Sequence, residues 1–550
     1  MKKEIYIIAL LLIELISCND NFLDRIPYDS ISSLTAYSTD EKATMSINGI
    51  YNALNQQYTL MGFPYIFTNI GPDGFGWSRD GQIEQGLATT KHATFLNVYT
   101  QLYKVIRLAN LGIANLSNNP TVSQDLSNRL LGEAKFMRGI AYFYLWQLYG
   151  EVVILDKPVS PSETYLPRNS ADEVKQLVIN DFEDAIPNLP VSYSSSDRGR
   201  ITQGAAIAML GKTYLYDKQW SKAAQEFQKL MVAPFNYGLV DDYAHLFNYK
   251  WENNSEVVFS MQEIMVLNYG GDYDMWYGGR SIITSGQSYS QPSYNIVTSY
   301  TNKDGSQIDM STMPKLSQFN NNDYNLGLQL IPWYQTTFAE SDDRLNKIII
   351  MPGATYDGIN PNTLAPLTFK VYWPYAQHAN DNPPAYRTQW IEKAFFSWRK
   401  YVSVGLENIE RWDAPHDINI IRYSDVLLMY AEAKNESEGP SNEVYDAINR
   451  VRNRAGVTNL SSNLSKDELR RYIWLERFHE FPGEGILFFD VRRWKTAATN
   501  DPIFGLNHDI LDFRGEKAVY KRAFAEKDYL WPIPQSEMDI NKQLTQNPGW

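Results

Sequence analysis

Residues 207–230 read IAMLGKTYLYDKQWSKAAQEFQKL, and this stretch decides the fold of the chain. Its apolar residues recur at helical spacing on either side of a polar break, which predicts two helices joined by a short turn. The small residues Gly211 and Ala223 allow two such helices to approach closely. Tyr214 and Phe227 then fill the space between them. The stretch therefore predicts a pair of antiparallel helices.

The same residues match the register of a tetratricopeptide repeat, in which Leu210-Gly211-x-x-Tyr214 is followed by Ala223-x-x-x-Phe227. A looser helical pair is predicted over residues 420–435 and 443–455, and further helices over 99–116 and 131–149. Each pair must bury its open face on a neighbour, so at least three pairs are expected. We predict a mainly α fold with a tetratricopeptide-like helix-pair scaffold.

The chain changes character between residue 256 and about residue 400. Gly, Pro, Asn, Tyr and Trp become frequent there, and only short strand-like runs remain, at 257–259 and 348–350. We therefore predict a single domain of residues 35–550, with a helical scaffold of about 35–255 and 401–550 and a loop-rich, irregular insert of about 256–400. Long loops on a rigid scaffold are frequent sites of binding.

The N-terminus has the layout of a secretory signal. Lys2 and Lys3 precede a mostly apolar run that is too short to cross a bilayer. The ending Leu15-Ile16-Ser17-Cys18 resembles a bacterial lipobox, and Cys18 is the only cysteine of the chain. We predict a signal peptide of residues 1–17, a lipid on Cys18, and a tether of residues 18–34 that holds the domain at a membrane.

Composition narrows the possible ligands. The net charge of −13 argues against nucleic acid as a partner, because binding phosphates requires an excess of Lys and Arg. Aromatic residues make up 14% of the chain, including 37 Tyr and 14 Trp. Tyr and Trp in loops offer flat apolar faces with a polar edge, on which sugar rings can stack. The composition therefore favours a carbohydrate ligand.

A series of motifs, in order along the mature chain, resembles the SusD/RagB family. These motifs begin with Cys18 to Asp24 and continue with Glu133-Ala-Lys-Phe-Met-Arg138, Leu148-Tyr-Gly150, Arg422-Tyr-Ser-Asp425, Asn449-x-x-Arg452-x-Arg454, Glu476-Arg-x-x-Glu480, Asp490-x-x-Arg493-Trp494, Leu530-Trp-Pro-Ile-Pro534 and Gln546-Asn-Pro-Gly549. The resemblance implies a nutrient-binding lipoprotein that lies on the cell outer membrane and is exposed at its surface. It also implies delivery of oligosaccharides or polysaccharides to a SusC-like TonB-dependent transporter. Most of the charged residues in these motifs are expected to hold the fold.

In this family the ligand site lies on loops, so the candidate residues are chosen by region. The first loop, residues 71–80, is rich in Gly and could present Trp77 outward, with polar groups beside it. The second, residues 269–294, surrounds several aromatic residues with Gly and Ser. The predicted ligand-binding residues are Asp73, Trp77, Arg79, Trp276, Tyr277, Arg280, Tyr289 and Trp333.

Other functions remain as alternatives. Tetratricopeptide-like helices can also bind peptides, as an interaction scaffold. A surface glycoside hydrolase would need two carboxylates about 5 to 9 Å apart, which sequence alone does not exclude. No zinc motif or phosphate loop is present, so no cofactor is expected and no catalytic residue is assigned. Asp272 and Asp274 lack the spacing of a calcium loop, so a structural calcium ion is possible but has no support.

Overall fold

The computed structural model describes residues 35–76, 80–267, 269–279, 286–314, 324–359, 366–372, 385–387, 396–403, 412–511, 515 and 518–550. Helices dominate this part of the chain and the strands are short, which confirms the prediction of a mainly α fold. Cys18 and the tether lie outside the described residues. Within those residues, no helix combines the length and the apolar character needed to cross a membrane.

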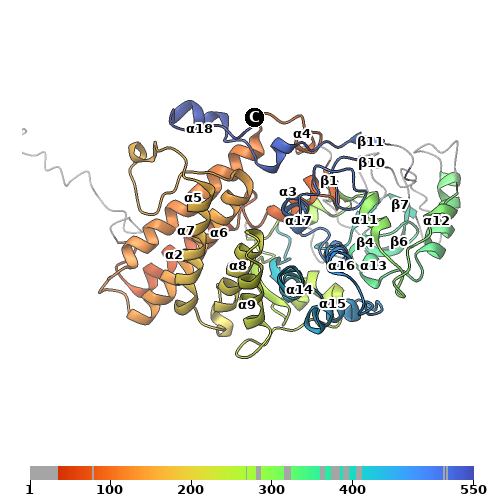
Figure 1. Cartoon of the computed structure of the whole chain (residues 1–550), viewed down its shortest axis with the longest axis horizontal. Coiled ribbons are helices and arrows are strands. Elements are labelled where there is room, and N and C mark those ends of the chain that lie inside the picture. The colour runs from red at the N-terminus through yellow and green to blue at the C-terminus, as the bar shows by residue number, and fades with distance from the viewer. Residues whose placement is uncertain are drawn as a thin grey trace, which may run out of the picture.

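Helices from the first half of the chain lie side by side (Figure 1). They are α2 (Asp40–Leu54), α5 (Ala93–Leu116), α6 (Gln124–Tyr149), α7 (Ala171–Ala185), α8 (Gln203–Tyr216) and α9 (Trp220–Leu230). From α5 onward each helix packs on the next along the chain. Polar side chains start several of them: the hydroxyls of Thr39, Ser170 and Thr202 accept hydrogen bonds from backbone N–H groups of the first turn.

The predicted helix pair of residues 207–230 is confirmed as α8 and α9. Gly211 faces Phe227 so closely that a Cβ atom at residue 211 would lie 2.8 Å from the phenyl ring. Phe227 is fully buried and Tyr214 is nearly so. The small residue therefore sets the distance between the two helices, and the aromatic residues fill the gap.

A second group of helices comes from the last third of the chain. It contains α14 (Tyr423–Glu438), α15 (Asn442–Arg454), α16 (Lys466–Glu480) and α17 (Ile486–Arg493). Helix α14 packs on α9 and so joins the two groups. The predicted pair is confirmed except at its start, because residues 420–422 belong to a strand instead. Ile420 and Ile421 are buried on that strand, and an apolar run of this length is compatible with either structure.

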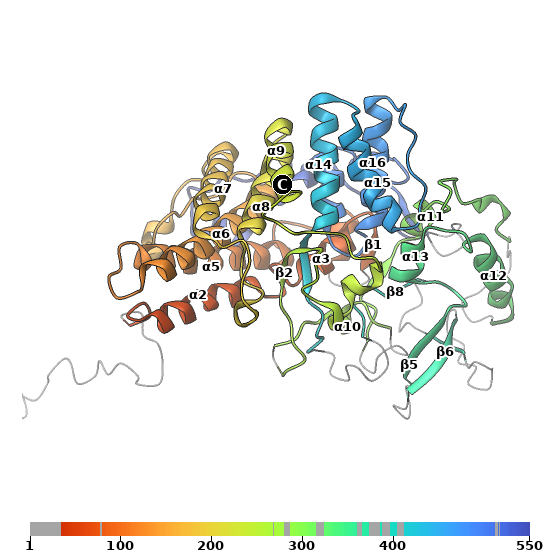
Figure 2. The same cartoon turned by 90° about the horizontal axis from the view of Figure 1, so that it is seen from below.

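The remaining helices are short and lie mostly between the two groups or after them. They are α3 (Phe63–Ile70), α4 (Gly81–Glu84), α10 (Tyr273–Trp276), α11 (Tyr294–Ser299), α12 (Tyr324–Thr337), α13 (Asp343–Ile348) and α18 (Gln535–Ile540). In Figure 2, α10 and the strands β5 and β6 lie toward the bottom of the view, and the helices α9, α14 and α16 toward the top.

Strands pair in small sheets. Antiparallel pairs join β1 (Gly74–Gly76) to β3 (Ser290–Pro292), β2 (Val257–Met261) to β9 (Ile418–Arg422), β4 (Ile349–Ile350) to β8 (Ser397–Trp398), and β10 (Asp509–Leu511) to β11 (Ala518–Lys521). A three-stranded sheet contains β5 (Thr355–Ile359), β6 (Pro366–Tyr372) and β7 (Ala385–Arg387). The strand-like runs at 257–259 and 348–350 thus correspond to β2 and, except for residue 348, to β4.

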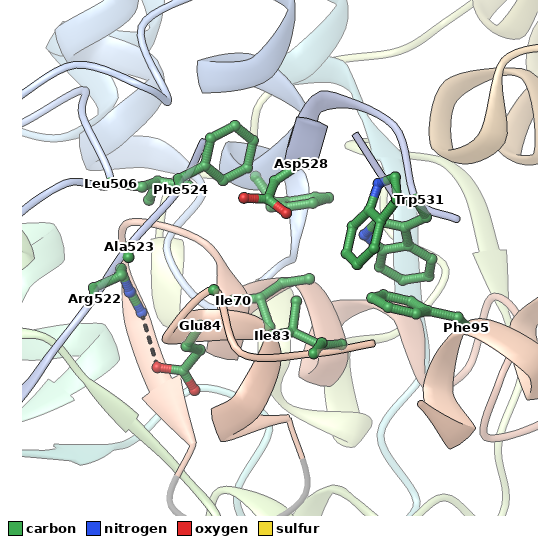
Figure 3. Close-up of a pocket in the computed structure, with 14 residues that line it drawn as sticks. Ile70, Ile83, Glu84, Phe95, Leu506, Arg522, Ala523, Phe524, Asp528 and Trp531 are labelled. Atoms are coloured by element: carbon green, nitrogen blue, oxygen red, sulfur yellow. Dashed lines mark hydrogen bonds and ion pairs between the residues drawn. The ribbon is translucent and has the colours of Figure 1, made fainter. Parts of the chain in front are cut away.

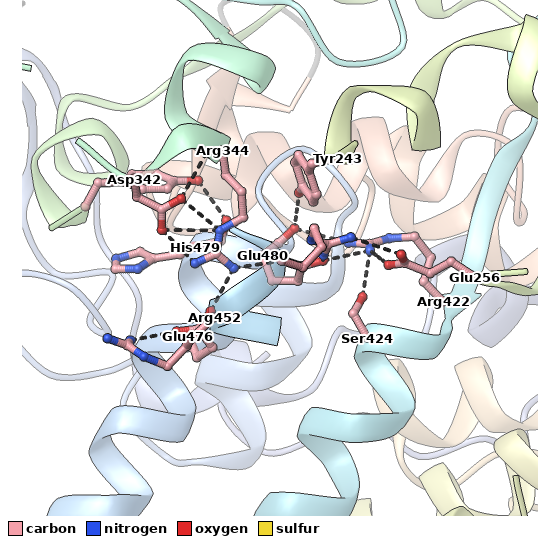
Figure 4. A network of polar contacts seen from close by, with 12 residues as sticks. Tyr243, Glu256, Asp342, Arg344, Arg422, Ser424, Arg452, Glu476, His479 and Glu480 are labelled. Atoms are coloured by element: carbon pink, nitrogen blue, oxygen red, sulfur yellow. Dashed lines mark hydrogen bonds and ion pairs between the residues drawn. The ribbon is translucent and has the colours of Figure 1, made fainter. Parts of the chain in front are cut away.

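A buried network of ion pairs connects α13, β9 and α16 (Figure 4). Arg344 lies 2.8 Å from carboxylate oxygens of both Glu476 and Glu480, and Arg422 lies 2.8 Å from Glu480. Burial alone would raise the pKa of Glu480, but the charges of Arg454, Arg422 and Arg344 outweigh it and hold this pKa well below its ordinary value. The network therefore keeps Glu480 ionised in the core and ties three distant segments together.

Other charged residues of the recognised motifs are also structural. Arg138 pairs with Asp181 at 2.6 Å, and Arg493 pairs with Glu432 at 2.5 Å; all four side chains are at least nine-tenths buried. The expectation that these motifs hold the fold is confirmed for these residues.

Candidate ligand-binding surface

The two predicted loops meet at the small sheet formed by β1 and β3. Gly76, the last residue of β1, lies opposite Ser290, the first residue of β3. The first loop continues directly from Gly76, and the second arrives directly at Ser290. Residues that are more than 200 positions apart in the sequence are therefore brought to one place, which we call the β1–β3 edge.

The first loop has a rigid base. The Arg522 guanidinium donates hydrogen bonds to the backbone carbonyls of Asn69, Gly71 and Gly74, and it lies 3.3 Å from a carboxylate oxygen of Glu84. Figure 3 shows this ion pair beside a small pocket under the loop. The second carboxylate oxygen of Glu84 accepts the N–H of Gly76 at 3.0 Å. A single buried arginine therefore fixes the turn that leads into residues 77–79.

Asp73 belongs to this base and does not face a ligand. Its side chain is fully buried, and its carboxylate accepts the backbone N–H of Gly483 at 2.7 Å. Burial raises the pKa of Asp73 to about 7, although this hydrogen bond and the charges of Lys400 and Arg522 act in the opposite direction. The predicted ligand contact of Asp73 is therefore corrected: this residue anchors the loop.

Trp276 and Tyr277 lie in the core rather than on the rim. Trp276 is 1% exposed and stacks on Tyr65 with a ring-centroid distance of 4.5 Å. Tyr277 is fully buried, donates a hydrogen bond to the carbonyl of Gly483 and stacks on Trp398. The expectation that these two rings face a ligand is wrong. They are the buried aromatic residues of the second loop and belong to the core.

The other predicted residues have varied positions. Tyr289 is partly buried and lies next to β3, and Trp333 is partly buried with its indole N–H donated to Thr312 at 3.1 Å. Trp77, Arg79 and Arg280 lie outside the described residues, as does Cys18. The roles of Trp77, Arg79, Arg280, Tyr289 and Trp333 stay predictions.

Sequence reasoning missed an exposed apolar surface close to α10. Ile264, Met265, Val266, Leu267 and Tyr269 are between 43% and 74% exposed, and Trp412 is 50% exposed. An antiparallel β-bridge between Gly271 and Ala414 brings the segment that contains residues 264–269 close to the segment that contains Trp412. We call this set of six residues the 264–269 patch. Its signal in the sequence was four consecutive apolar residues outside any helix or strand.

Carboxylates lie next to this patch along the chain: Glu263 precedes Ile264, and the Asp417 carboxylate accepts the N–H of Glu263 at 3.0 Å. Burial raises the pKa of Glu263 to about 8, that of Asp417 to about 7 and that of Asp272 to about 6. Glu252 belongs to the same group, and its pKa is raised to about 8 by burial and by the nearby Asp417. Nevertheless, no group of three or more His, Cys, Asp or Glu side chains among the described residues has a geometry that could hold a metal ion.

Comparison with known proteins identifies the family. A model described as the SusD family matches residues 255–550, and a second, described as starch-binding and associating with the outer membrane, matches residues 21–215. A SusD-like protein of Formosa agariphila, P25, is 22% identical over 530 residues, which cover 90% of each chain.

Solved structures show the same fold. The chain matches a SusD-like carbohydrate-binding protein of Bacteroides fragilis with a TM-score of 0.76 and 23% identity, covering 93% of this chain and 100% of that one. It also matches surface glycan-binding protein A of Bacteroides thetaiotaomicron, solved with laminarihexaose, with a TM-score of 0.65 and 18% identity, covering 92% and 99%. The ordered motifs, the helix-pair scaffold and these matches agree, and the chain belongs to the SusD family.

Proposed function

We propose that this protein captures oligosaccharides or polysaccharides at the surface of the outer membrane, by binding and not by hydrolysis. The observation that carries the proposal is the β1–β3 edge, where two aromatic, Gly-rich loops meet on a base held by Arg522 and Asp73. A rigid base below variable loops is the usual arrangement of a recognition site. The carbohydrate-binding and laminarihexaose-bound proteins with this fold support the same ligand class.

The contacts we propose come from the ends of the two loops. In the sequence, Trp77 directly follows Gly76 and Tyr289 directly precedes Ser290, the strand partner of Gly76. Arg79 and Arg280 would supply donors for sugar hydroxyls. An aromatic platform contributes about 1 kcal/mol beyond burial. Two platforms and a few hydrogen bonds correspond to dissociation constants of roughly micromolar to millimolar, weak enough for the ligand to be passed on.

We also propose that Cys18 carries the lipid anchor and that a SusC-like TonB-dependent transporter receives the ligand. The 264–269 patch supports a contact with such a partner, because Ile264 to Leu267 have aliphatic side chains with no group that could bond a sugar. An apolar hollow on the transporter is the occupant that fits.

The test is affinity electrophoresis of residues 19–550 against a polysaccharide panel that includes starch and laminarin. One glycan class should retard the protein, and Trp77→Ala or Tyr289→Ala should abolish the retardation without lowering the melting temperature. Binding that survives both substitutions would place the site elsewhere. Separately, Leu267→Asp should prevent co-purification with the transporter while leaving glycan binding unchanged.

A further inference from the structure

A wide groove lies between the middle of α5, the segment of residues 153–165 and the C-terminal helix α18. Its volume is about 460 Å³, inside the range of about 300–1,000 Å³ that is typical of small-molecule sites. In Figure 1, α5 and α18 lie on the left of the view and β1 lies right of its centre, and no residue that lines the groove belongs to the two loops of the β1–β3 edge. The groove is therefore separate from the proposed glycan site.

Three cations line this groove: Lys104 and Arg107 from α5, and Lys157 from the opposite wall. All three are exposed, and none has an ion pair or hydrogen bond from its side chain among the described residues. The only carboxylate in the lining is Glu537, whose pKa is raised by burial. The groove thus has a local positive charge in a chain whose net charge is −13, so it would attract an anion.

The walls between these cations suit a sugar ring. Tyr165 is 46% exposed and Tyr103 is partly buried, so both offer ring surface to the groove. The Tyr103 hydroxyl donates to the carbonyl of Val153 at 2.7 Å, and the Asn110 amide donates to the carbonyl of Leu155 at 2.7 Å. These bonds fix the two walls relative to each other. A pyranose could stack on a tyrosine while its acidic group meets a cation.

We propose that the groove is a second saccharide site and that it takes acidic sugars, with carboxylate or sulfate groups bound by Lys104, Arg107 and Lys157. This inference rests on the proposed function only in taking a saccharide as the ligand. Such a site would hold an acidic part of a glycan whose other part binds at the loops, or select acidic glycans from a mixture. An anionic lipid headgroup carries a negative charge, as an acidic sugar does, but phosphatidylglycerol has no pyranose ring. It therefore serves as the competing ligand in the test.

The test measures binding of the protein of residues 19–550 to galacturonate hexasaccharide, sulfated dextran and neutral maltohexaose by calorimetry at low salt. The triple variant Lys104→Ala/Arg107→Ala/Lys157→Ala should lose about tenfold or more in affinity for an acidic probe and nothing for maltohexaose. The matched control Lys91→Ala/Lys222→Ala/Lys229→Ala removes the same charge from exposed lysines elsewhere and should keep the affinity. Tyr165→Ala should weaken binding of the same acidic probe. The acidic probe that binds with the higher affinity shows whether the groove prefers carboxylate or sulfate.

Equal affinity for acidic probes in the triple variant and in its control would overturn the proposal. So would loss of sedimentation with phosphatidylglycerol vesicles in the triple variant, combined with no binding of either acidic saccharide. A loss of maltohexaose or starch binding in Trp77→Ala, with unchanged acidic-probe affinity in the triple groove variant, would support the loop site and refute the groove. The two proposals therefore fail separately.

Discussion

Arg522 offers the sharpest test of how the candidate site is built. Its side chain is 1% exposed, donates to the backbone carbonyls of Asn69 in α3 and of Gly71 and Gly74 in the first loop, and pairs with the buried Glu84. In Arg522→Met the carbonyls lose their donor and the Glu84 carboxylate stays buried without its cation. Removing one partner of a buried ion pair costs about 3–5 kcal/mol. We expect a loss of at least this size, since each unpaired carbonyl adds to it.

The assay is urea unfolding of residues 19–550 followed by tryptophan fluorescence. Arg471→Met is the matched control, because Arg471 also pairs with a carboxylate, Asp501 at 3.2 Å, but its side chain is 60% exposed. An exposed pair contributes about 0–1 kcal/mol, so this control should unfold almost as the wild type does. The double variant Arg522→Met/Glu84→Gln should recover part of the loss, because the stranded charge is gone.

Glycan binding should also weaken in Arg522→Met. Below its unfolding transition, Arg522→Met should bind the retarding glycan at least about tenfold more weakly, because the turn that leads into residues 77–79 is no longer fixed. If Arg522→Met unfolds within about 1 kcal/mol of the wild type, the ion pair and the three carbonyl contacts do not hold the loop. The reasoning about a rigid base would then be refuted.

Three further outcomes are expected. Trp276→Ala should cost about 3–5 kcal/mol in urea unfolding, because the indole is buried against Tyr65; a cost below about 1 kcal/mol would contradict its place in the core. Gly211→Ala should lower the melting temperature, with a cost of about 1–3 kcal/mol, because its Cβ meets the Phe227 ring at 2.8 Å; an unchanged melt would contradict this close approach. Burial raises the pKa of Glu263 to about 8, so the folded state keeps a proton that the unfolded chain releases above pH about 4, and stability should fall as pH rises from about 4 to 8. Glu263→Gln should flatten that profile in pH-dependent unfolding, and an equally steep profile would show that another group causes it.

The helices could be read from the sequence because their signals are local. The spacing within residues 207–230 and 131–149 is enough to predict α8, α9 and most of α6, and the helix pair follows from Gly211 and Phe227 alone. The start of α14 could not be placed, since the apolar residues just before it suit a strand as well as a helix. Only the pairing of β9 with β2, which begins at Val257, shows that these residues form a strand and not a helix.

The candidate site could be predicted by region but not by residue. Whether an aromatic ring in a Gly-rich loop faces solvent depends on distant partners: Trp276 stacks on Tyr65, and Tyr277 bonds to Gly483. Neither partner is near in sequence, so the composition of the loop could not show which aromatic rings are buried in the core and which face solvent. The groove at Lys104 was missed for the same reason, because its far wall is α18, more than 400 residues later.

The pairing of β2 with β9 has a consequence for how such a protein can change. Met261 lies opposite Ile418, so the 156 residues between them leave the helical scaffold and return to it at adjacent positions, beside the ion network at Arg422. The entropy of closing a loop grows only with the logarithm of its length, and each doubling costs about 0.6 kcal/mol. Loops within this segment can therefore be lengthened or shortened at a small entropic cost, provided that Arg344, whose buried ion pairs reach Glu476 and Glu480 of α16, is kept. Loop exchange between relatives within this segment would alter the second loop of the proposed site, while the first loop, residues 71–80, would stay unchanged.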